Sequence, residues 1–195
     1  TFYTVPYEVV TKLLLIPAAL AGVLFPAFTR YFGSDRAATT VLFIKGMRSV
    51  CLLLFPALLL AVVFAESGLR QWVGGELADQ GTVVVPWLAV GVLINAVAFV
   101  PLALIHGAAR PDLAAKLHLI ELPIYLLAVW WMIGQWGIAG AAAAWTGRVT
   151  LDATVLMVMS RRVLARPLPG AAITALLVAV AIGVLVIGAV IPDQL

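Results

Sequence analysis

Long apolar stretches separated by short polar connections constrain this chain more than any other feature. We place them at residues 5–28, 45–65, 83–105, 117–134, 138–160 and 171–191. A helix rises about 1.5 Å per residue, so about 20 apolar residues cross the roughly 30 Å hydrocarbon core of a bilayer. The composition agrees, because 64% hydrophobic and only 11% charged residues leave more apolar surface than a soluble domain can bury. The sequence therefore predicts an all-α fold, a polytopic bundle of six transmembrane helices.

Basic residues gather in alternate connections of this predicted bundle. Residues 30–48, 110–116 and 161–166 contain nine of the twelve Lys and Arg residues. The intervening connection, residues 66–81, holds Arg70 and three acidic residues. Because short cytoplasmic connections are enriched in Lys and Arg, the first set is predicted to face the cytoplasm. Tryptophans near the opposite helix ends fit an aromatic belt at the outer interface: Trp72, Trp87, Trp130, Trp131 and Trp136.

The first residues also suggest how the chain relates to a whole protein. It starts at Thr1, already inside a hydrophobic pattern, with neither a basic n-region nor a small-residue cleavage site. Under strict alternation the last apolar stretch ends outside the membrane. We therefore expect the chain to be a piece of a longer protein, with further helices before Thr1.

Two pairs of ionisable residues lie inside the apolar stretches. Glu8 and Lys12 are four residues apart, as are Arg148 and Asp152, so each pair shares one helix face. Arg148 follows residue 138 by ten positions, which places it about 15 Å deep, near the middle of the bilayer. Charged groups at such depth are costly and need a partner or water. These four residues are therefore candidates for ion pairing, ion coupling or ligand binding.

Two more polar residues join the candidates. Asn95 lies deep in the third stretch, and Glu121 lies near the cytoplasmic end of the fourth. Two interpretations of the whole set stay open. The pairs neutralise themselves and assist insertion, or they line an aqueous path that meets a charged ligand or a coupling ion. Arg148 is the stronger candidate for contact with a charged ligand, because its planar guanidinium suits phosphate oxygens.

No pattern of covalent chemistry accompanies these residues. The sequence has no nucleotide-binding glycine loop, no nucleophile elbow and no catalytic carboxylate pair. His106 and His118 are expected at the inner interface, without the Cys or acidic neighbours that a metal site needs. No basic patch is large enough for nucleic acid. We therefore expect a protein that is not an enzyme, with no cofactor, no metal site and no nucleic-acid partner.

Several short motifs resemble a known family. The first stretch has Tyr3 and Tyr7, then Pro17, and ends in Leu24-Phe25-Pro26 before Arg30. The third stretch ends in Pro101-Leu-Ala-Leu-Ile-His-Gly-Ala-Ala-Arg110-Pro111, and the fifth opens with Trp136-Gly137-Ile-Ala-Gly140. In order and spacing, these motifs resemble the C-terminal half of the polysaccharide flippases of the MOP (multidrug/oligosaccharidyl-lipid/polysaccharide) superfamily. These are the Wzx-like O-antigen and exopolysaccharide translocases.

The resemblance implies a transporter of 12–14 helices, of which this chain forms about half. Such proteins of the bacterial inner membrane flip polyprenyl-pyrophosphate-linked oligosaccharides by alternating access, with H+ or Na+ coupling. The implied partners are this lipid-linked substrate, membrane lipids and the N-terminal half of the same protein. The implied cavity residues are Arg148, Lys12 and Asn95, and the implied coupling or ion-pairing residues are Asp152, Glu8 and Glu121.

Three alternatives remain beside the O-antigen flippase. Two are other branches of the superfamily, a peptidoglycan-precursor flippase and a cation-coupled multidrug exporter. An exporter is expected to line its cavity with acidic groups and to lack cations that face a phosphate. The third alternative is a membrane scaffold of a glycan-assembly complex that transports nothing, and there charge-neutral changes at Lys12 and Arg148 should have no effect.

Overall fold

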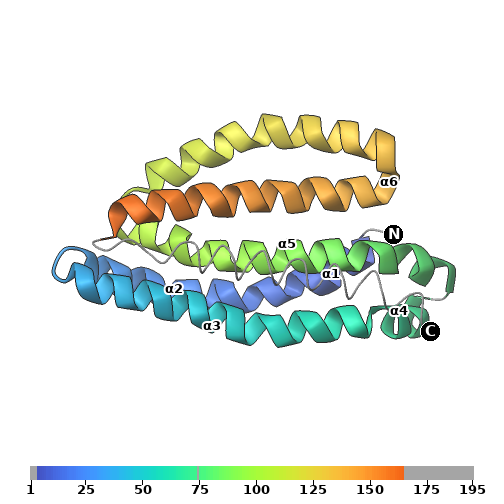
Figure 1. The fold of residues 1–195 in the computed structure, drawn as a ribbon, viewed down its shortest axis with the longest axis horizontal. Coiled ribbons are helices and arrows are strands. Elements are labelled where there is room, and N and C mark those ends of the chain that lie inside the picture. The colour runs from blue at the N-terminus through green and yellow to red at the C-terminus, as the bar shows by residue number, and fades with distance from the viewer. Residues whose placement is uncertain (1–3, 74, 165–195) are drawn as a thin grey trace.

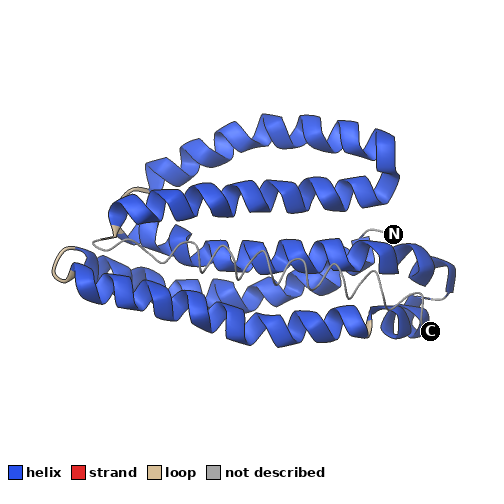
Figure 2. Ribbon diagram, in the orientation of Figure 1, coloured by secondary structure: helices blue, strands red, loops and turns tan. Residues whose placement is uncertain are grey.

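The computed structural model describes residues 4–73 and 75–164, and these residues form helices joined by short connections (Figure 1). The elements are α1 (Thr4–Thr11), the 3₁₀ helix η1 (Lys12–Leu14), α2 (Leu15–Phe32), α3 (Arg36–Val63), α4 (Ala65–Val73), α5 (Gly75–Gly107) and α6 (Pro111–Val163). No strand occurs in the described ranges, which confirms the all-α prediction (Figure 2). The predicted stretch 171–191 lies outside the described residues.

The described helices include several of membrane-spanning length. Four segments are long and apolar enough to cross a membrane: Tyr7–Phe32, Arg36–Val63, Val84–Gly107 and Pro111–Val163. The last of these doubles back on itself (Figure 1). Its reversal lies at Gly137, where φ is 56° and ψ is −130°, a conformation that glycine adopts far more easily than other residues. We call residues 111–136 the N-terminal arm of α6 and residues 138–163 its C-terminal arm.

Helix α5 is the centre of the bundle. In the apolar 18-residue window of the α5 span, 78% of the residues are buried. In the corresponding window of α6 the buried share is 11%. Helices α1, α2, α3, α4 and α6 all contact α5. The C-terminal arm of α6 packs on α5, and the N-terminal arm lies beyond it on the outer side (Figure 1). A helix that is apolar on all sides belongs in such a position, because it has no polar face to expose.

Two predicted boundaries differ from the structure. Helix α3 begins at Arg36 and not at Lys45, because Asp35 caps it by accepting a hydrogen bond from the backbone N–H of Ala38 at 2.9 Å. Lys45 and Arg48 are therefore exposed residues of α3, and the expectation that they belong to a connection is wrong. Likewise, the predicted connection 66–81 contains most of α4 and the start of α5. Hydropathy locates the apolar part of a helix and misses its polar extensions.

The first helix is interrupted near its predicted ion pair. Between α1 and α2, residues Lys12–Leu14 form a 3₁₀ turn. Pro17 follows this turn, and proline has no N–H to donate and clashes with the carbonyl of residue 13 in a regular α-helix. The tighter 3₁₀ turn accommodates that conflict.

The two ends of the bundle differ in composition, with basic connections at one end and exposed tryptophans at the other. The α2–α3 turn, the α5–α6 connection and the end of the C-terminal arm lie at one end of the bundle, and the Gly137 reversal lies at the other (Figure 1). The three predicted basic connections therefore meet at one end. At the opposite end, Trp130 and Trp136 are exposed, as an interfacial belt requires. Which compartment the basic end faces stays a prediction.

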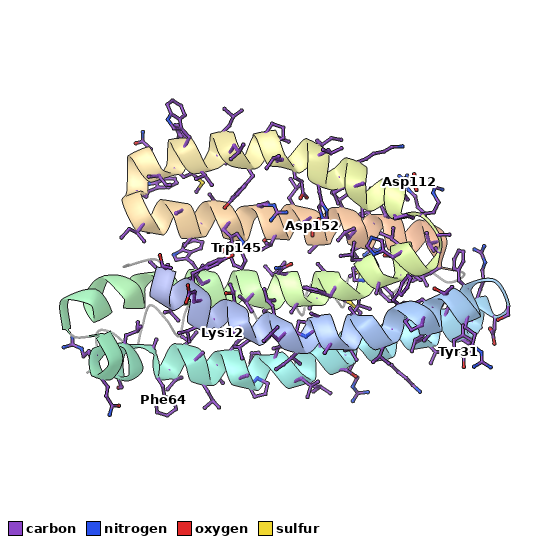
Figure 3. All side chains as sticks on the ribbon, turned by 180° about the vertical axis from the view of Figure 1, so that it is seen from behind. Lys12, Tyr31, Phe64, Asp112, Trp145 and Asp152 are labelled. Atoms are coloured by element: carbon purple, nitrogen blue, oxygen red, sulfur yellow. The ribbon has the colours of Figure 1, made fainter. Side chains whose placement is uncertain are left out.

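The contact between α5 and the C-terminal arm depends on a glycine. A Cβ at Gly91 would overlap the Trp145 ring, lying 2.8 Å from its Cε3 atom and 2.9 Å from Thr146 Oγ1. Figure 3 shows Trp145 projecting from the C-terminal arm toward α5. We expect Gly91→Ala to lower the free energy of unfolding by about 1–2 kcal/mol, because overpacking forces the Trp145 ring to move. Denaturant titration in detergent measures this. Unchanged stability in Gly91→Ala, with Gly22→Ala as a control at an open position, would contradict it.

Candidate functional site

Four ionisable side chains meet between the two arms of α6. His118 Nε2 lies 3.2 Å from Asp152 Oδ1, and the Arg148 guanidinium lies 3.7 Å from Glu121 Oε2. His118 and Glu121 belong to the N-terminal arm, and Arg148 and Asp152 to the C-terminal arm. We call these four residues the hairpin cluster. Figure 3 places Asp152 in the middle part of the C-terminal arm.

The local sequence explains how the hairpin cluster forms. His118 and Glu121 are three residues apart and Arg148 and Asp152 four apart, so each pair shares one face of its own arm. The reversal at Gly137 turns these two faces toward each other. Gly140 brings the arms close, because a Cβ there would overlap the carbonyl group of Met132.

Glu121 has the most demanding environment in the hairpin cluster. Its side chain is only 2% exposed, and neither carboxylate oxygen has a hydrogen-bond partner among the described residues. The ion pair with Arg148 compensates its charge but is too long for a hydrogen bond. A buried carboxylate without hydrogen bonds is costly. Glu121 is therefore poised to accept a further cationic or hydrogen-bonding partner.

Arg148 lies at the border between the hairpin cluster and a pocket. The pocket has a volume of about 230 Å³ and is lined by residues of both arms, among them Glu121, Tyr125, Met132 and Arg148. The Arg148 guanidinium carbon lies 5.7 Å from the centre of the Tyr125 ring, which supports a cation–π contact. Its side chain is 34% exposed, so it can reach a ligand in the pocket. The pocket therefore presents one cation and one carboxylate among mostly apolar walls, which suits a charged group of an amphipathic ligand.

The direct ion-pair contacts differ from the pairs that the spacing within each helix suggested. Arg148 pairs with Glu121 and Asp152 with His118, so the contacts cross from arm to arm and do not run between Arg148 and Asp152. Among the described residues, Glu8 and Lys12 form no ion pair with each other.

Two predicted cavity residues lie outside this pocket. Lys12 is exposed in η1, whereas Asn95 is partly buried in α5, and neither residue lines the pocket between the arms. Tyr7, one turn before Lys12, packs edge-on against Trp145 with ring centres 5.7 Å apart. Helix α1 therefore contacts the C-terminal arm. The roles of Lys12, Asn95 and Glu8 in a substrate cavity stay predictions.

Sequence reasoning missed two members of the site. His118 was expected at the interface without acidic neighbours, and that expectation is wrong, because Glu121 and Asp152 lie beside it. Tyr125 was not singled out, although it follows Glu121 by four residues and shares its face. The signal that could have found both is the run of polar residues at positions 118, 121 and 125 of an otherwise apolar helix.

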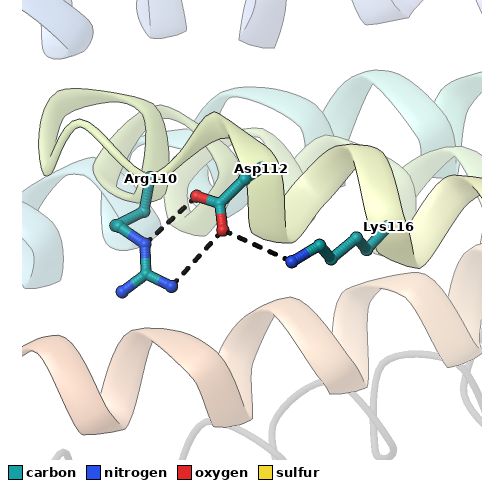
Figure 4. Close-up of polar contacts among 3 residues, drawn as sticks. All are labelled: Arg110, Asp112 and Lys116. Carbon is teal, nitrogen blue, oxygen red and sulfur yellow. Dashed lines mark hydrogen bonds and ion pairs between the residues drawn. The ribbon is translucent and has the colours of Figure 1, made fainter.

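A second charged group marks the start of α6. Asp112 accepts hydrogen bonds from Arg110 at 3.1 and 3.4 Å, and its other contact is Lys116 Nζ at 3.9 Å (Figure 4). Asp112 lies in the first helical turn after Pro111, where a negative charge complements the helix dipole. These side chains are exposed at the basic end of the bundle. They fix the start of the hairpin and lie outside the hairpin cluster.

The fold and the hairpin cluster define a polytopic helical membrane protein with ionised groups inside its bundle. The chain is 29% identical over 155 residues to a protein of Shigella flexneri named "Putative O-antigen transporter". The match covers 80% of this chain, and the chain spans about 37% of the length of that curated relative. The chain matches no protein-family model and no solved structure. The similarity supports the expected relationship to O-antigen transporters.

Proposed function

We propose that the chain is part of a transporter that flips a polyprenyl-pyrophosphate-linked oligosaccharide across the bacterial inner membrane for cell-surface polysaccharide synthesis. The similarity to the O-antigen transporter, over 80% of the chain, carries this proposal. The long apolar helices support it, because such a substrate keeps its lipid tail in the bilayer while its polar head crosses. The protein works by alternating access between helices, driven by H+ or Na+, and needs no enzymatic step.

Arg148 is the residue that we propose for the pyrophosphate. It lines a pocket whose other walls are mostly apolar, and charges attract more strongly in such surroundings than in water. A guanidinium binds phosphate oxygens through two parallel hydrogen bonds, which an ammonium group cannot do. Lys12 and Asn95 are proposed as further contacts on neighbouring helices, in a cavity that the rest of the protein completes.

Glu121 supports a second candidate, a cation-coupled exporter of the same superfamily. A buried carboxylate that lines the pocket suits a cationic drug better than a pyrophosphate. In this alternative Arg148 only compensates Glu121 in the empty pocket. The two candidates differ in substrate charge, so transport of a lipid-pyrophosphate-linked sugar distinguishes them from transport of an organic cation.

The experiment reconstitutes the full-length protein in vesicles and follows a lipid-pyrophosphate-linked sugar across the bilayer under imposed H+ or Na+ gradients. We expect Arg148→Ala to slow flipping about 10–100-fold, because hydrogen bonds to charged groups contribute about 1.5–3 kcal/mol. Arg148→Lys should recover only part of the rate. Lys12→Ala tests the second cation, and Arg110→Ala is the matched control, since Arg110 is exposed at the basic end.

Each result has a definite consequence. Slow flipping by folded and inserted Arg148→Ala, with normal flipping by Arg110→Ala, supports the function and the role of Arg148. Equal rates in wild type and Arg148→Ala contradict the role of Arg148 and leave the function in place. If the wild type moves no lipid-linked sugar under either gradient, the flippase proposal is wrong, and transport of an organic cation then distinguishes the exporter from the scaffold.

A further inference from the structure

The hairpin cluster contains a set of donors that the transport proposal does not use. His118 Nε2 and one carboxylate oxygen each of Glu121 and Asp152 lie within 4.8 Å of one another. Both carboxylates are buried, and the Glu121 oxygens lack hydrogen-bond partners among the described residues. We propose that His118, Glu121 and Asp152 bind a divalent cation of the Zn²⁺ or Mn²⁺ class between the arms of α6.

The donors lie near enough to one another for a modest side-chain movement to form a site. Zn²⁺ lies about 2.0–2.2 Å from nitrogen and oxygen ligands, so two ligands of one ion are at most roughly 4.4 Å apart. Neighbouring ligands of a tetrahedral Zn²⁺ are about 3.3–3.6 Å apart, so donors that lie up to 4.8 Å apart have to close by about 1 Å or slightly more. His118 and Asp152, at 3.2 Å, already have the separation of neighbouring ligands. A rotation of the Glu121 carboxylate toward His118 would complete the set.

The donor types select the class of ion. Na⁺, Ca²⁺ and Mg²⁺ prefer oxygen ligands, whereas an imidazole nitrogen beside carboxylates suits Zn²⁺, Mn²⁺ and similar ions. The sulfur of Cys51 is on α3 and contributes nothing here. The His118 side chain is 43% exposed, so an ion has a route to the buried carboxylates. Three protein ligands leave at least one coordination position open.

Arg148 links this cation site to the pocket. With a neutral imidazole, the two carboxylates and Arg148 leave one formal negative charge in excess. A divalent ion reverses the excess to one positive charge. The ion would replace Arg148 as the partner of Glu121, and this exchange is cheap, because their ion pair includes no hydrogen bond. Tyr125 then holds the released guanidinium at the pocket, where it faces a ligand.

Other charged groups do not compensate the two carboxylates. On the N-terminal arm the flanking ionisable residues are Lys116, which is exposed and contacts Asp112, and Tyr125, and on the C-terminal arm Arg148 is the neighbouring cation. Helix α5, which packs against α6, has no ionisable residue between Val84 and Ile105. With a neutral imidazole at His118, an added cation can meet this excess negative charge.

Cation binding can be measured without any transport. The full-length protein is purified in detergent, stripped of metals with a chelator, and titrated with Zn²⁺ by calorimetry and with Co²⁺ by visible absorption. We expect a saturable site of one ion per chain in the wild type. His118→Ala, Glu121→Gln and Asp152→Asn should each weaken it at least about 100-fold, beyond the loss of an outer-shell partner. Asp112→Asn is the matched control, because Asp112 is an exposed carboxylate outside the hairpin cluster.

His118→Ala is the decisive variant, because its exposed side chain can be removed without leaving a cavity in the core. Equal Zn²⁺ affinity in wild type and His118→Ala would overturn the site. A wild type that shows no saturable Zn²⁺ binding would overturn it as well. So would a wild type whose calorimetric signal comes only from proton binding. The site itself does not depend on transport, whereas its effect on Arg148 rests on the proposed function. Zn²⁺ binding by a protein that flips no lipid-linked sugar would contradict the proposed function alone.

Discussion

Replacing Gly140 with alanine should open the α6 hairpin and lower the free energy of unfolding by about 3 kcal/mol or more. A Cβ at this position would overlap the Met132 carbonyl oxygen and lie 2.6 Å from its carbonyl carbon. These are backbone atoms of the N-terminal arm, so no side-chain rotation relieves the clash. The arms would have to separate just beyond the Gly137 reversal, and the hairpin cluster would separate with them.

Denaturant titration of the protein in detergent measures this loss, and Gly134→Ala is the matched control. Gly134 lies close to the same reversal, and a Cβ there meets nothing within 4 Å. Alanine favours a helix over glycine by about 0.5–1 kcal/mol, so the control should be as stable as the wild type or more stable. If Gly140→Ala were as stable as Gly134→Ala, the close approach of the two arms would be wrong.

The second large effect is expected at the Arg148–Glu121 ion pair. Arg148→Ala leaves the Glu121 carboxylate buried without a compensating charge, and breaking a buried pair costs about 3–5 kcal/mol. We expect a value near the lower limit, because the Arg148 side chain is 34% exposed and water screens part of the interaction. Glu121→Gln should cost less, since the freed guanidinium stays at the pocket beside Tyr125.

A double-mutant cycle tests the pairing directly. The variant with both Arg148→Ala and Glu121→Gln should recover most of the stability that Arg148→Ala loses, because no uncompensated charge remains. Unfolding free energies of the four proteins give the coupling energy. A cycle with Arg148→Ala and Asp152→Asn, the pair expected from spacing alone, should show a smaller coupling energy. Additive effects at Arg148 and Glu121 would contradict their ion pair.

The hairpin cluster shows why local spacing was insufficient for the site. A spacing of four residues places two side chains on one helix face, and Arg148 and Asp152 are so placed. Yet each finds its partner on the other arm, because two facing helices bring opposite charges together across the interface. Glu8 and Lys12 have the same spacing and also form no ion pair with each other among the described residues. Neither outcome can be read from the distance between residues along the chain.

The sequence by itself determined the class of protein and the order of its helices. Long apolar stretches are stable only inside a bilayer or a large core. Basic residues in alternate connections define one end of the bundle. Only the tertiary structure decided that α5 lies at the centre and that the two arms of α6 form a hairpin. It also decided which charges meet, because Gly137 and Gly140 bring into contact residues 27 to 34 positions apart, such as His118 and Asp152. The hydropathy of a segment depends only on its own residues. Ion pairs between helices depend also on the register in which the helices pack.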